Sequence, residues 1–366
     1  MRSLRVLITL GLTICNYATI HANEFHNYSI YKYPEDLYKR RKLSSKGGYQ
    51  LRTDQRENNE IRTRLEAAKF SPTTKINGNL NFVSGAVRNG VKGEAAHSTY
   101  EYKLKLSSSI TGKDLLITKL EVGNALESSL GLDLQSSRGQ ELQITSLYYT
   151  FPVDKNIRVS VGPKMFGYEG LAGTSSAYNE RIAILDGSNY STDAGNGAAF
   201  VISYLSDNGY NSSLKLTSEN ANNSSEGILT EEGKDSLIYQ VGYSAESFGG
   251  TVTFNKTDEF DALGLGVYIS PEKLPSLSAS IELKNQDNGQ EIINWLLALN
   301  KTNKDSTIGI GFGTYDINEN IAYEVWYNYN LTDTIMINPI LFVKKEGNSL
   351  INKDEFGFGL NARFKF

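Results

Sequence analysis

The sequence predicts an all-β protein, a transmembrane antiparallel β-barrel of about 16 strands that follows a short helical or linker segment. Three observations lead to this fold class. Residues 356–366 alternate between apolar residues and glycine or polar residues, over the length of about 9–11 residues that a tilted strand needs to cross a membrane. The same period-two pattern begins at Thr73 and continues from there. The connections between the predicted strands alternate between short and long, as in outer-membrane barrels.

The composition agrees with a barrel but also with a large β-sandwich. The chain has 366 residues, a net charge of -4 and 39% hydrophobic residues. Its 22 Tyr and 33 Gly suit aromatic girdles at a membrane interface and strongly curved strands. After residue 22 no apolar run approaches the ~18 residues of a transmembrane helix. The near-neutral charge gives no general case for nucleic acid binding.

Few residues could support catalysis or hold a metal or cofactor. The single cysteine is Cys15, and the three histidines are His21, His26 and His97. A disulfide, a cysteine-based metal site and a histidine-based catalytic triad are therefore not expected. His97 is the one histidine in the predicted barrel, and no serine motif accompanies it. We therefore expect no catalytic residues, no cofactor and no metal site.

Residues 1–22 are predicted to be a secretory signal peptide. Arg2 and Arg5 form its positive end, residues 6–14 its apolar stretch, and Ala22 its cleavage site, with Ala18 as the alternative. Cys15 follows Ile14 where a lipoprotein signal would have a small residue, so lipidation is disfavoured.

Residues 23–72 are predicted to be a polar periplasmic linker with a short helix. Residues 39–42 form a basic run, and residues 54–69 combine helix formers with opposite charges at helical spacings. A solvated linker, a periplasmic stalk and a plug that enters the pore all remain open for this segment. Residues 73–366 are predicted to form the outer-membrane β-barrel domain.

Sixteen strands account for the pattern from Thr73 onward. Two stretches depart from clean alternation: residues 142–151 slip in phase as if bulged, and residues 292–299 are apolar on both faces. The predicted strands are 74–87, 98–111, 113–124, 140–152, 156–166, 196–206, 209–218, 235–246, 248–256, 260–270, 276–286, 290–300, 305–315, 319–331, 333–344 and 354–366.

The lengths of the connections give a second test of the barrel. If the first strand leaves the periplasm, even-numbered junctions should be short periplasmic turns and odd-numbered junctions external loops. The turns near 111–114, 152–156, 207–209 and 332–333 are short, and the long connections 88–97, 125–139, 167–195, 219–234 and 345–353 all fall on the other side. The short external turns near 287–289 and 316–319 make this asymmetry incomplete.

The connection 167–195 is the longest and becomes the third external loop. A connection of this length usually has a functional reason. Folded inward, its charges would narrow an aqueous lumen and sort solutes by charge. Otherwise it is an exposed, hydrophilic surface loop. Its constriction residues would be Glu169, Tyr178, Glu180, Arg181, Asp186 and Asp193, with Tyr168 and Tyr190 nearby.

Strand parity also predicts residues that line the pore, although a shift of one residue would turn any of them outward. More of them are basic than acidic, which favours anionic or polar solutes. They are Lys103, Lys105, Lys119, Glu121, Arg158 and Arg363, together with Lys215, Glu282, Lys284 and Lys365.

Residues 65–204 resemble the cyanobacterial branch of the carbohydrate-selective (OprB-type) porin family. The resemblance rests on the order and spacing of four stretches: 65–76 (LEAAKFSPTTKI), 111–124 (TGKDLL with Leu120 and GN), 147–153 (LYYTFPV) and 195–199 (GNGAA). It implies an outer-membrane diffusion channel, labelled in the family for sugars or for inorganic iron uptake. Family members usually carry an S-layer homology domain before the barrel. The segment before residue 73 is too short for that domain, so peptidoglycan anchoring is not expected.

The leading hypothesis from the sequence is therefore a porin of the cell outer membrane, not an enzyme. It would pass small hydrophilic solutes, including sugars or inorganic ions, by passive diffusion. Its expected partners are outer-membrane lipid, those solutes and two further copies in a homo-trimer, with residues 295–299 as a candidate interface, and no nucleic acid. The alternative is a structural or adhesive outer-membrane barrel with a closed pore.

Overall fold

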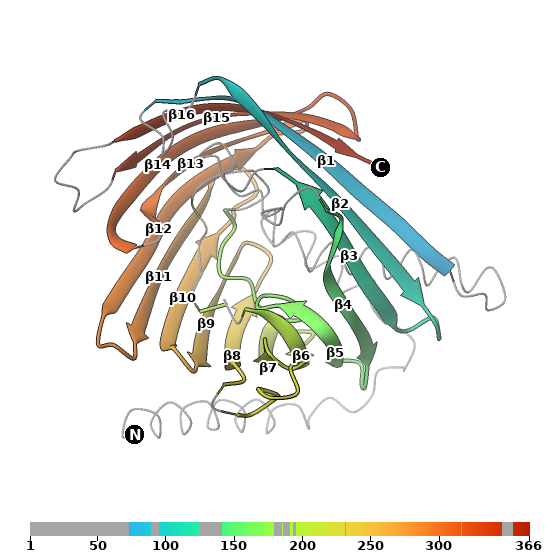
Figure 1. The fold of residues 1–366 in the computed structure, drawn as a ribbon. Coiled ribbons are helices and arrows are strands. Elements are labelled where there is room, and N and C mark those ends of the chain that lie inside the picture. The colour runs from blue at the N-terminus through green and yellow to red at the C-terminus, as the bar shows by residue number, and fades with distance from the viewer. Residues whose placement is uncertain are drawn as a thin grey trace. The chain divides into compact units, whose positions relative to one another are not determined.

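A computed structural model describes residues 73–88, 95–124, 141–178, 185, 191–192, 195–230, 232–315, 317–345 and 354–366. The predicted signal peptide and the predicted linker lie outside these residues. The regular secondary structure within these ranges is all β-strand (Figure 1). No helix within the described ranges has the length and apolar character that a membrane-spanning helix requires.

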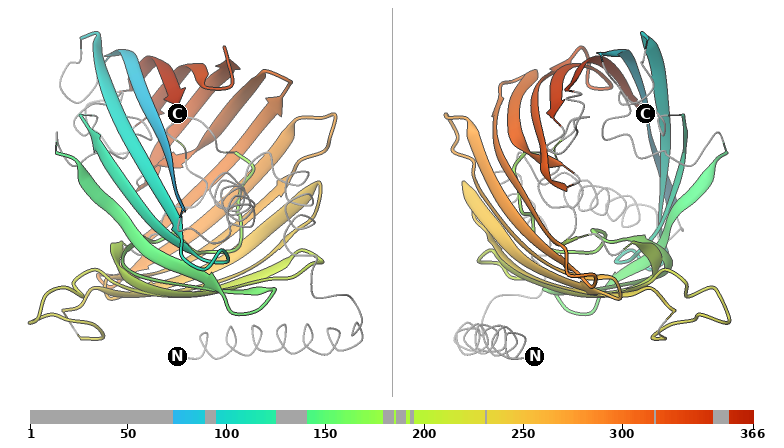
Figure 2. Two further views of the ribbon diagram at one scale, coloured as in Figure 1. Left: turned by 90° about the vertical axis from the view of Figure 1, so that its right-hand side faces the viewer. Right: turned by 60° about the vertical axis from the view of Figure 1, so that its left-hand side comes forward.

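Sixteen antiparallel strands form one closed barrel, which confirms the predicted fold class. Each strand pairs with its neighbours in sequence, and β1 closes the sheet by pairing with β16 (Figures 1 and 2). The strands are β1 Thr73–Arg88, β2 His97–Ser109, β3 Leu115–Gly123, β4 Gln143–Pro152, β5 Ile157–Phe166, β6 Asn196–Leu205, β7 Tyr210–Ser218, β8 Asp235–Ser244, β9 Phe248–Thr257, β10 Phe260–Ile269, β11 Ser276–Gln286, β12 Glu291–Thr302, β13 Ser306–Tyr315, β14 Ile317–Asn330, β15 Ile335–Lys345 and β16 Glu355–Lys365.

The phase slip in residues 142–151 is a bulge. The pairing of β3 with β4 shifts register where Lys119 faces Ser146 but Leu120 faces Ile144, which leaves Thr145 as the extra residue. A second irregularity follows between β4 and β5, at Leu147 and Tyr149. An extra residue reverses the side-chain alternation along a strand. The period-two pattern therefore breaks at this point although the strand continues.

The two faces of the barrel wall differ in polarity as the alternation predicts. On β14, Tyr323 and Val325 are 41% and 42% exposed, whereas Glu324 between them is 1% exposed. Apolar side chains project outward on most strands, and soluble proteins rarely expose so large an apolar band. Members of this outer band include Phe82, Phe200, Ile202, Leu214, Leu216, Val252, Leu265, Val267, Leu277, Ile281, Ile293, Leu297, Leu299, Ile310, Val325, Leu341, Phe356, Phe358 and Leu360.

The connections give the barrel two different ends. At the short-turn end, the junctions β2–β3, β4–β5, β6–β7, β8–β9, β10–β11, β12–β13 and β14–β15 are brief, and β1 begins there. At the other end, here called the long-connection end, β5 is joined to β6 by residues 167–195 and β7 to β8 by residues 219–234.

Candidate pore lining and inward connection

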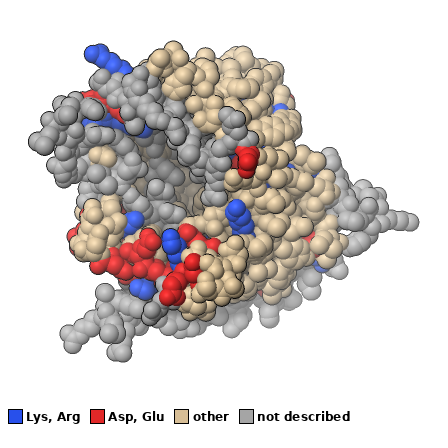
Figure 3. All heavy atoms as spheres, in the orientation of Figure 1, with Lys and Arg blue, Asp and Glu red and all other residues tan. Residues whose placement is uncertain are grey.

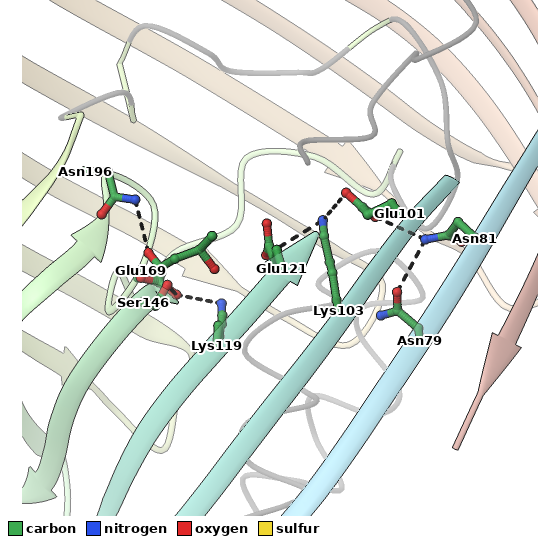
Figure 4. Close-up of polar contacts among 10 residues, drawn as sticks. Asn79, Asn81, Glu101, Lys103, Lys119, Glu121, Ser146, Glu169 and Asn196 are labelled. Atoms are coloured by element: carbon green, nitrogen blue, oxygen red, sulfur yellow. Dashed lines mark hydrogen bonds and ion pairs between the residues drawn. The ribbon is translucent and has the colours of Figure 1, made fainter. Parts of the chain in front are cut away.

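The connection 167–195 begins with a charged anchor at the inner wall. Lys119 of β3 contacts the Glu169 carboxylate at 2.6 Å, and the Ser146 hydroxyl of β4 donates to the same oxygen at 2.9 Å (Figure 4). The second carboxylate oxygen accepts the backbone N–H of Phe166 at 2.8 Å. Glu169 is buried, so these three donors compensate for removing its charge from water.

Lys215 of β7 supports the same anchor from another strand. Its ammonium donates to the carbonyl oxygens of Phe166 and Glu169, the latter at 3.1 Å. Lys215 is fully buried. The Phe166 carbonyl also accepts the backbone N–H of Glu169 at 3.0 Å, so Lys215 reinforces a turn that the backbone already closes.

Beyond this anchor, the connection follows the inner wall across several strands. The backbone N–H groups of Ala172, Gly173 and Ala177 donate to side chains of the wall at 2.7, 2.7 and 2.9 Å. The acceptors are Ser213 on β7, Gln240 on β8 and Ser278 on β11. Since these residues alternate with outward apolar residues, the connection lies inside the barrel.

Farther along, Tyr178 binds two residues of β14. Its hydroxyl donates to the Glu324 carboxylate at 2.7 Å and accepts the indole N–H of Trp326 at 2.8 Å. The second Glu324 oxygen accepts the backbone N–H of Leu185 at 3.2 Å. We call Tyr178, Glu324 and Trp326 the latch. All three side chains are about 1% exposed, and low dielectric strengthens hydrogen bonds between well-matched partners.

A second wall carboxylate holds a later part of the connection. Glu282 of β11 accepts the backbone N–H of Ser191 at 2.7 Å. Glu282 is buried, as is Ser191. Glu282 and Glu324, both on the inner wall, thus accept hydrogen bonds from the connection.

Glycines make room where the connection approaches the wall. A Cβ atom at Gly266 would lie 2.4 Å from the carbonyl oxygen of Ser175, and one at Gly311 would lie 2.6 Å from the Tyr178 hydroxyl. Any larger residue would force the connection away. Glycines on the inner faces of β10 and β13 therefore accommodate the connection.

The segment that is apolar on both faces, in β12, has two different surroundings. Leu297 and Leu299 belong to the outer band, while Leu296 and Ala298 pack inward with the latch residues Tyr178 and Trp326. The inward apolar face is therefore a packed contact inside the barrel. The outward face of the segment remains a candidate subunit interface.

On the wall formed by β16, β1, β2 and β3, charged and amide side chains form a chain of contacts (Figure 4). Glu101 receives hydrogen bonds or ion pairs from Asn81 at 3.1 Å and from Lys103 at 2.8 Å. Lys103 also lies 4.0 Å from Glu121. Arg363 extends the chain by donating to Asn81 at 2.9 Å. Opposite charges partly neutralise one another here, so the wall is polar rather than simply basic.

The residues that the sequence singled out are only partly brought together. Lys119 and Glu169 are in contact, Lys103 and Glu121 form a second group, and Tyr178 lies farther along the wall. Lys105 pairs in register with Lys119, and Arg158 lies on β5 beside Ser203 of β6. Glu180, Arg181, Asp186 and Asp193 lie outside the described residues.

Several contact residues escaped sequence reasoning. Glu101, Asn81, Ser146, Gln240 and Glu324 were not identified as site residues because polar residues on an inner face simply look like lumen. One signal was available for the latch. Trp326 is a large aromatic residue on the polar face of its strand, and Gly309 and Gly311 occupy the inner face of the neighbouring strand.

Charges at the rim are distributed differently from those inside. Figure 3 shows Asp and Glu side chains gathered on one rim of the barrel. Some pair with lysines, as Lys256 does with Asp261 at 3.1 Å and Lys234 with Glu259 at 4.0 Å. In the described part of the chain, no group of three or more His, Cys, Asp or Glu residues could hold a metal ion.

Comparison with solved structures places this barrel among porins in fold. A mutant of Rhodopseudomonas blastica porin matches with a TM-score of 0.56 and 13% identity, covering 80% of this chain and 100% of that one. A high-pH structure of Pseudomonas putida OprB matches with a TM-score of 0.59 and 11% identity, covering 83% and 96%. A structure titled for the asymmetric conductivity of engineered proteins matches with a TM-score of 0.56 and 12% identity, covering 80% and 100%. At these identities the likeness concerns the fold alone.

Sequence comparison adds little to this. An uncharacterized protein of Synechocystis sp. is 29% identical over 131 residues, which cover 32% of this chain and 24% of that protein. The aligned stretch thus spans about a quarter of that relative. No protein family model matches the chain.

Proposed function

We propose that this protein is an outer-membrane porin through which small hydrophilic solutes diffuse passively. The observation that carries the proposal is the closed 16-strand barrel with an apolar outer band and a polar inner wall. Such a barrel satisfies all backbone hydrogen bonds within lipid. It is also wide enough to enclose an aqueous channel. The porin and OprB structures with the same fold support this assignment.

The connection 167–195 is proposed to set the width of the channel. Its hydrogen bonds to β7, β8, β11 and β14 hold it along one side of the interior. The solute path would then run between this connection and the part of the wall that carries Lys103, Lys105 and Arg363. Glu180, Arg181, Asp186 and Asp193 are proposed to contribute to the same constriction.

Anionic or neutral polar solutes fit this lining best. The carboxylates of Glu282 and Glu324 both accept hydrogen bonds from the connection, so they would contribute little negative charge to the solute path. Sugars and inorganic ions are both within the proposed range. The resemblance to carbohydrate-selective porins and the OprB structure with the same fold favour sugars.

The proposed location follows from the same features. Residues 1–22 would direct export, the short-turn end would face the periplasm, and residues 23–72 would lie on that side. Porins with an inward third loop commonly associate as trimers through apolar wall strands. We therefore propose a homo-trimer with the outward side of residues 295–299 in its interface.

The test is a single-channel recording of the purified protein in a planar lipid bilayer. Open conductance steps with weak voltage dependence are expected. Deleting residues 175–190, which removes the latch tyrosine, should enlarge the steps because it removes part of the constriction.

The outcomes separate the channel from its constriction. Steps of unchanged size in the deletion variant would retain the porin and reject the constriction. Absence of steps from folded protein would reject diffusion through the barrel and favour a structural barrel with a closed pore.

A further inference from the structure

Arg363 lies on the inner wall near the end of β16, and the protein uses only part of its guanidinium group. The Nε of Arg363 donates to the Asn81 carboxamide oxygen at 2.9 Å. A guanidinium group carries five N–H donors. Within the described residues, the four donors of its two terminal nitrogens have no acceptor, and the side chain is only half-buried. Arg363 can therefore bind an acceptor that enters the lumen.

The neighbours of Arg363 on the inner face do not neutralise its charge. In register it lies between Asn81 of β1 and Met336 of β15. Asn81 is uncharged, and the thioether of Met336 is only a weak acceptor. The next residue in this line, Glu101 of β2, already receives Lys103 at 2.8 Å and Asn81 at 3.1 Å. The positive charge of Arg363 is therefore not paired with a carboxylate of the described wall.

Asn81 fixes the orientation of two donor groups. Its side chain is 3% exposed, and its carboxamide nitrogen donates to Glu101 at 3.1 Å and to the Asn79 carboxamide oxygen at 3.3 Å (Figure 4). Asn79 thus turns its oxygen towards Asn81, while its own nitrogen has no acceptor among the described residues. Arg363 and Asn79 are diagonal neighbours on β16 and β1, about 7–8 Å apart along the wall. Both sets of donors can therefore reach one ligand.

The charges around these donors favour an anion. Asn79 lies in register between Lys365 of β16 and Lys103 of β2. The parallel N–H groups of a guanidinium fork match two oxygens of a carboxylate or a phosphoryl group, and such charge-assisted bonds are about twice as strong as neutral ones. The hydroxyl groups of a neutral sugar offer only single, uncharged acceptors. An oxyanion therefore fits this arrangement better than a neutral solute does.

We propose that Arg363 and Asn79, both oriented by Asn81, form a site in the lumen that binds the carboxylate or phosphoryl group of a small solute. Arg363 would bind two oxygens of the oxyanion, and the Asn79 amide would donate to the same group. Asn81 is a positioning residue that does not touch the solute. The inference rests on the proposed porin function and deepens it, because it names acidic solutes, such as sugar acids and sugar phosphates, as the class that the lumen selects.

The test compares three probes that differ in one group. Glucuronate carries a carboxylate, a glucose monophosphate carries a phosphoryl group, and glucose carries neither. Saturation-transfer NMR measures the Kd of each probe for the purified protein, folded in detergent micelles. At least one of the two anions should bind about tenfold or more tightly than glucose.

Three variants separate the guanidinium fork from its charge. Arg363→Lys keeps the positive charge but loses the planar fork, so it should weaken anion binding about tenfold. Asn81→Ala should weaken anion binding by a similar factor although Arg363 remains, and it should leave glucose binding unchanged. Lys344→Gln is the control, because Lys344 lies at the long-connection end of β15, where it pairs with Glu355 at 3.9 Å. It should leave the Kd of every probe unchanged.

Circular dichroism and thermal unfolding first show that each variant is folded, and if Asn81→Ala is not, the comparison of Arg363→Lys with Lys344→Gln decides. Failure of both anions to bind more tightly than glucose would overturn the site. Unchanged anion binding in Arg363→Lys would do the same, because charge alone would then suffice. Tighter binding of only one anion would support the site and identify its oxyanion.

Binding is measured without current, so the site and the porin function can fail separately. A protein that conducts in a bilayer but does not prefer the anions would lose only the site. A protein that binds the anions but does not conduct would lose only the porin function.

Discussion

Asp114 lies in the turn between β2 and β3, at the short-turn end, and organises that turn through one carboxylate. It accepts hydrogen bonds from the Ser109 hydroxyl at 2.8 Å, from the backbone N–H groups of Ile110 and Thr111 at 2.9 Å each, and from the Tyr149 hydroxyl. Burial by itself would raise the pKa of Asp114. The hydrogen bond from Tyr149 and those from the turn outweigh it and lower the pKa from 3.8 to about 2.

This shift predicts an acid-sensitive turn. Because the pKa is lower in the folded than in the unfolded protein, the stabilisation is complete above about pH 4 and is lost as the pH falls towards 2. Thermal unfolding in detergent should show this loss in the natural protein. Asp114→Asn should be less stable at pH 7 and should lose less stability between pH 4 and 2. Parallel pH profiles for the two proteins would contradict this role.

Glu324 is the residue on which the latch depends. Glu324→Gln keeps the size of the side chain, but its amide group would place a donor against the hydroxyl of Tyr178 or the N–H of Leu185. We expect a loss of about 1–3 kcal/mol in the free energy of unfolding. Urea unfolding in micelles measures this loss, and faster proteolysis of the 167–195 connection should accompany it.

The matched control for Glu324 is Glu272→Gln, in the exposed turn between β10 and β11. This substitution removes a carboxylate that does not belong to the latch. It should change neither the free energy of unfolding nor the rate at which the 167–195 connection is cleaved. If Glu324→Gln behaved like this control, the latch would not hold the connection.

At the scale of the element, β12 separates two kinds of apolar contact in adjacent positions. Leu296 is 2% exposed and packs with the latch, whereas Leu297 is 50% exposed in the outer band. Leu296→Ala should cost about 2–5 kcal/mol because it leaves a cavity beneath the connection. Leu297→Ala should cost less, since lipid or detergent chains can fill the space. Equilibrium unfolding of the two variants compares them directly, and equal losses would contradict the assigned faces.

The strands could be predicted from the sequence, whereas the contacts between distant residues could not. The sixteen strands follow from period-two patterning, and the observed bounds lie within a few residues of the predicted ones, as with Leu115–Gly123 for the predicted 113–124. The bulge in β4 left a visible phase slip. The contacts of the 167–195 connection left almost no signal in the sequence. Tyr178 and Glu324 are 146 residues apart, and the residue type alone does not identify so distant a partner.

In the whole molecule, the sheet closes into a barrel, so alternate residues of each strand face either the interior or the outside. Parity alone predicted which residues could face the interior. It could not show that Glu101 and Glu121 pair with Lys103, or that Lys119 pairs with Glu169. These ion pairs reduce the net field of the inner wall. A sequence count of basic and acidic residues therefore overstates how basic the lumen is.

The ion selectivity of the proposed channel would depend on the charges that remain after this pairing. If the lysines of β2 and β3 line the solute path, the natural protein should be weakly anion-selective in a bilayer with a salt gradient. Lys105→Gln should move the reversal potential towards cation selectivity, because Lys105 pairs in register with another lysine, Lys119. The effect should shrink at high salt, where the Debye length falls to about 3 Å.

Lys256→Gln provides the control for this measurement. Lys256 is exposed beside the β9–β10 turn and pairs with Asp261, so its charge lies at the rim and outside the narrow part of the path. Lys256→Gln should therefore change the reversal potential much less than Lys105→Gln does. If both variants shift equally, selectivity arises from the rim charges that Figure 3 shows rather than from the inner wall. If neither variant changes the reversal potential, the lysines of the inner wall do not face the solute path. The proposed position of that path in the lumen would then be wrong.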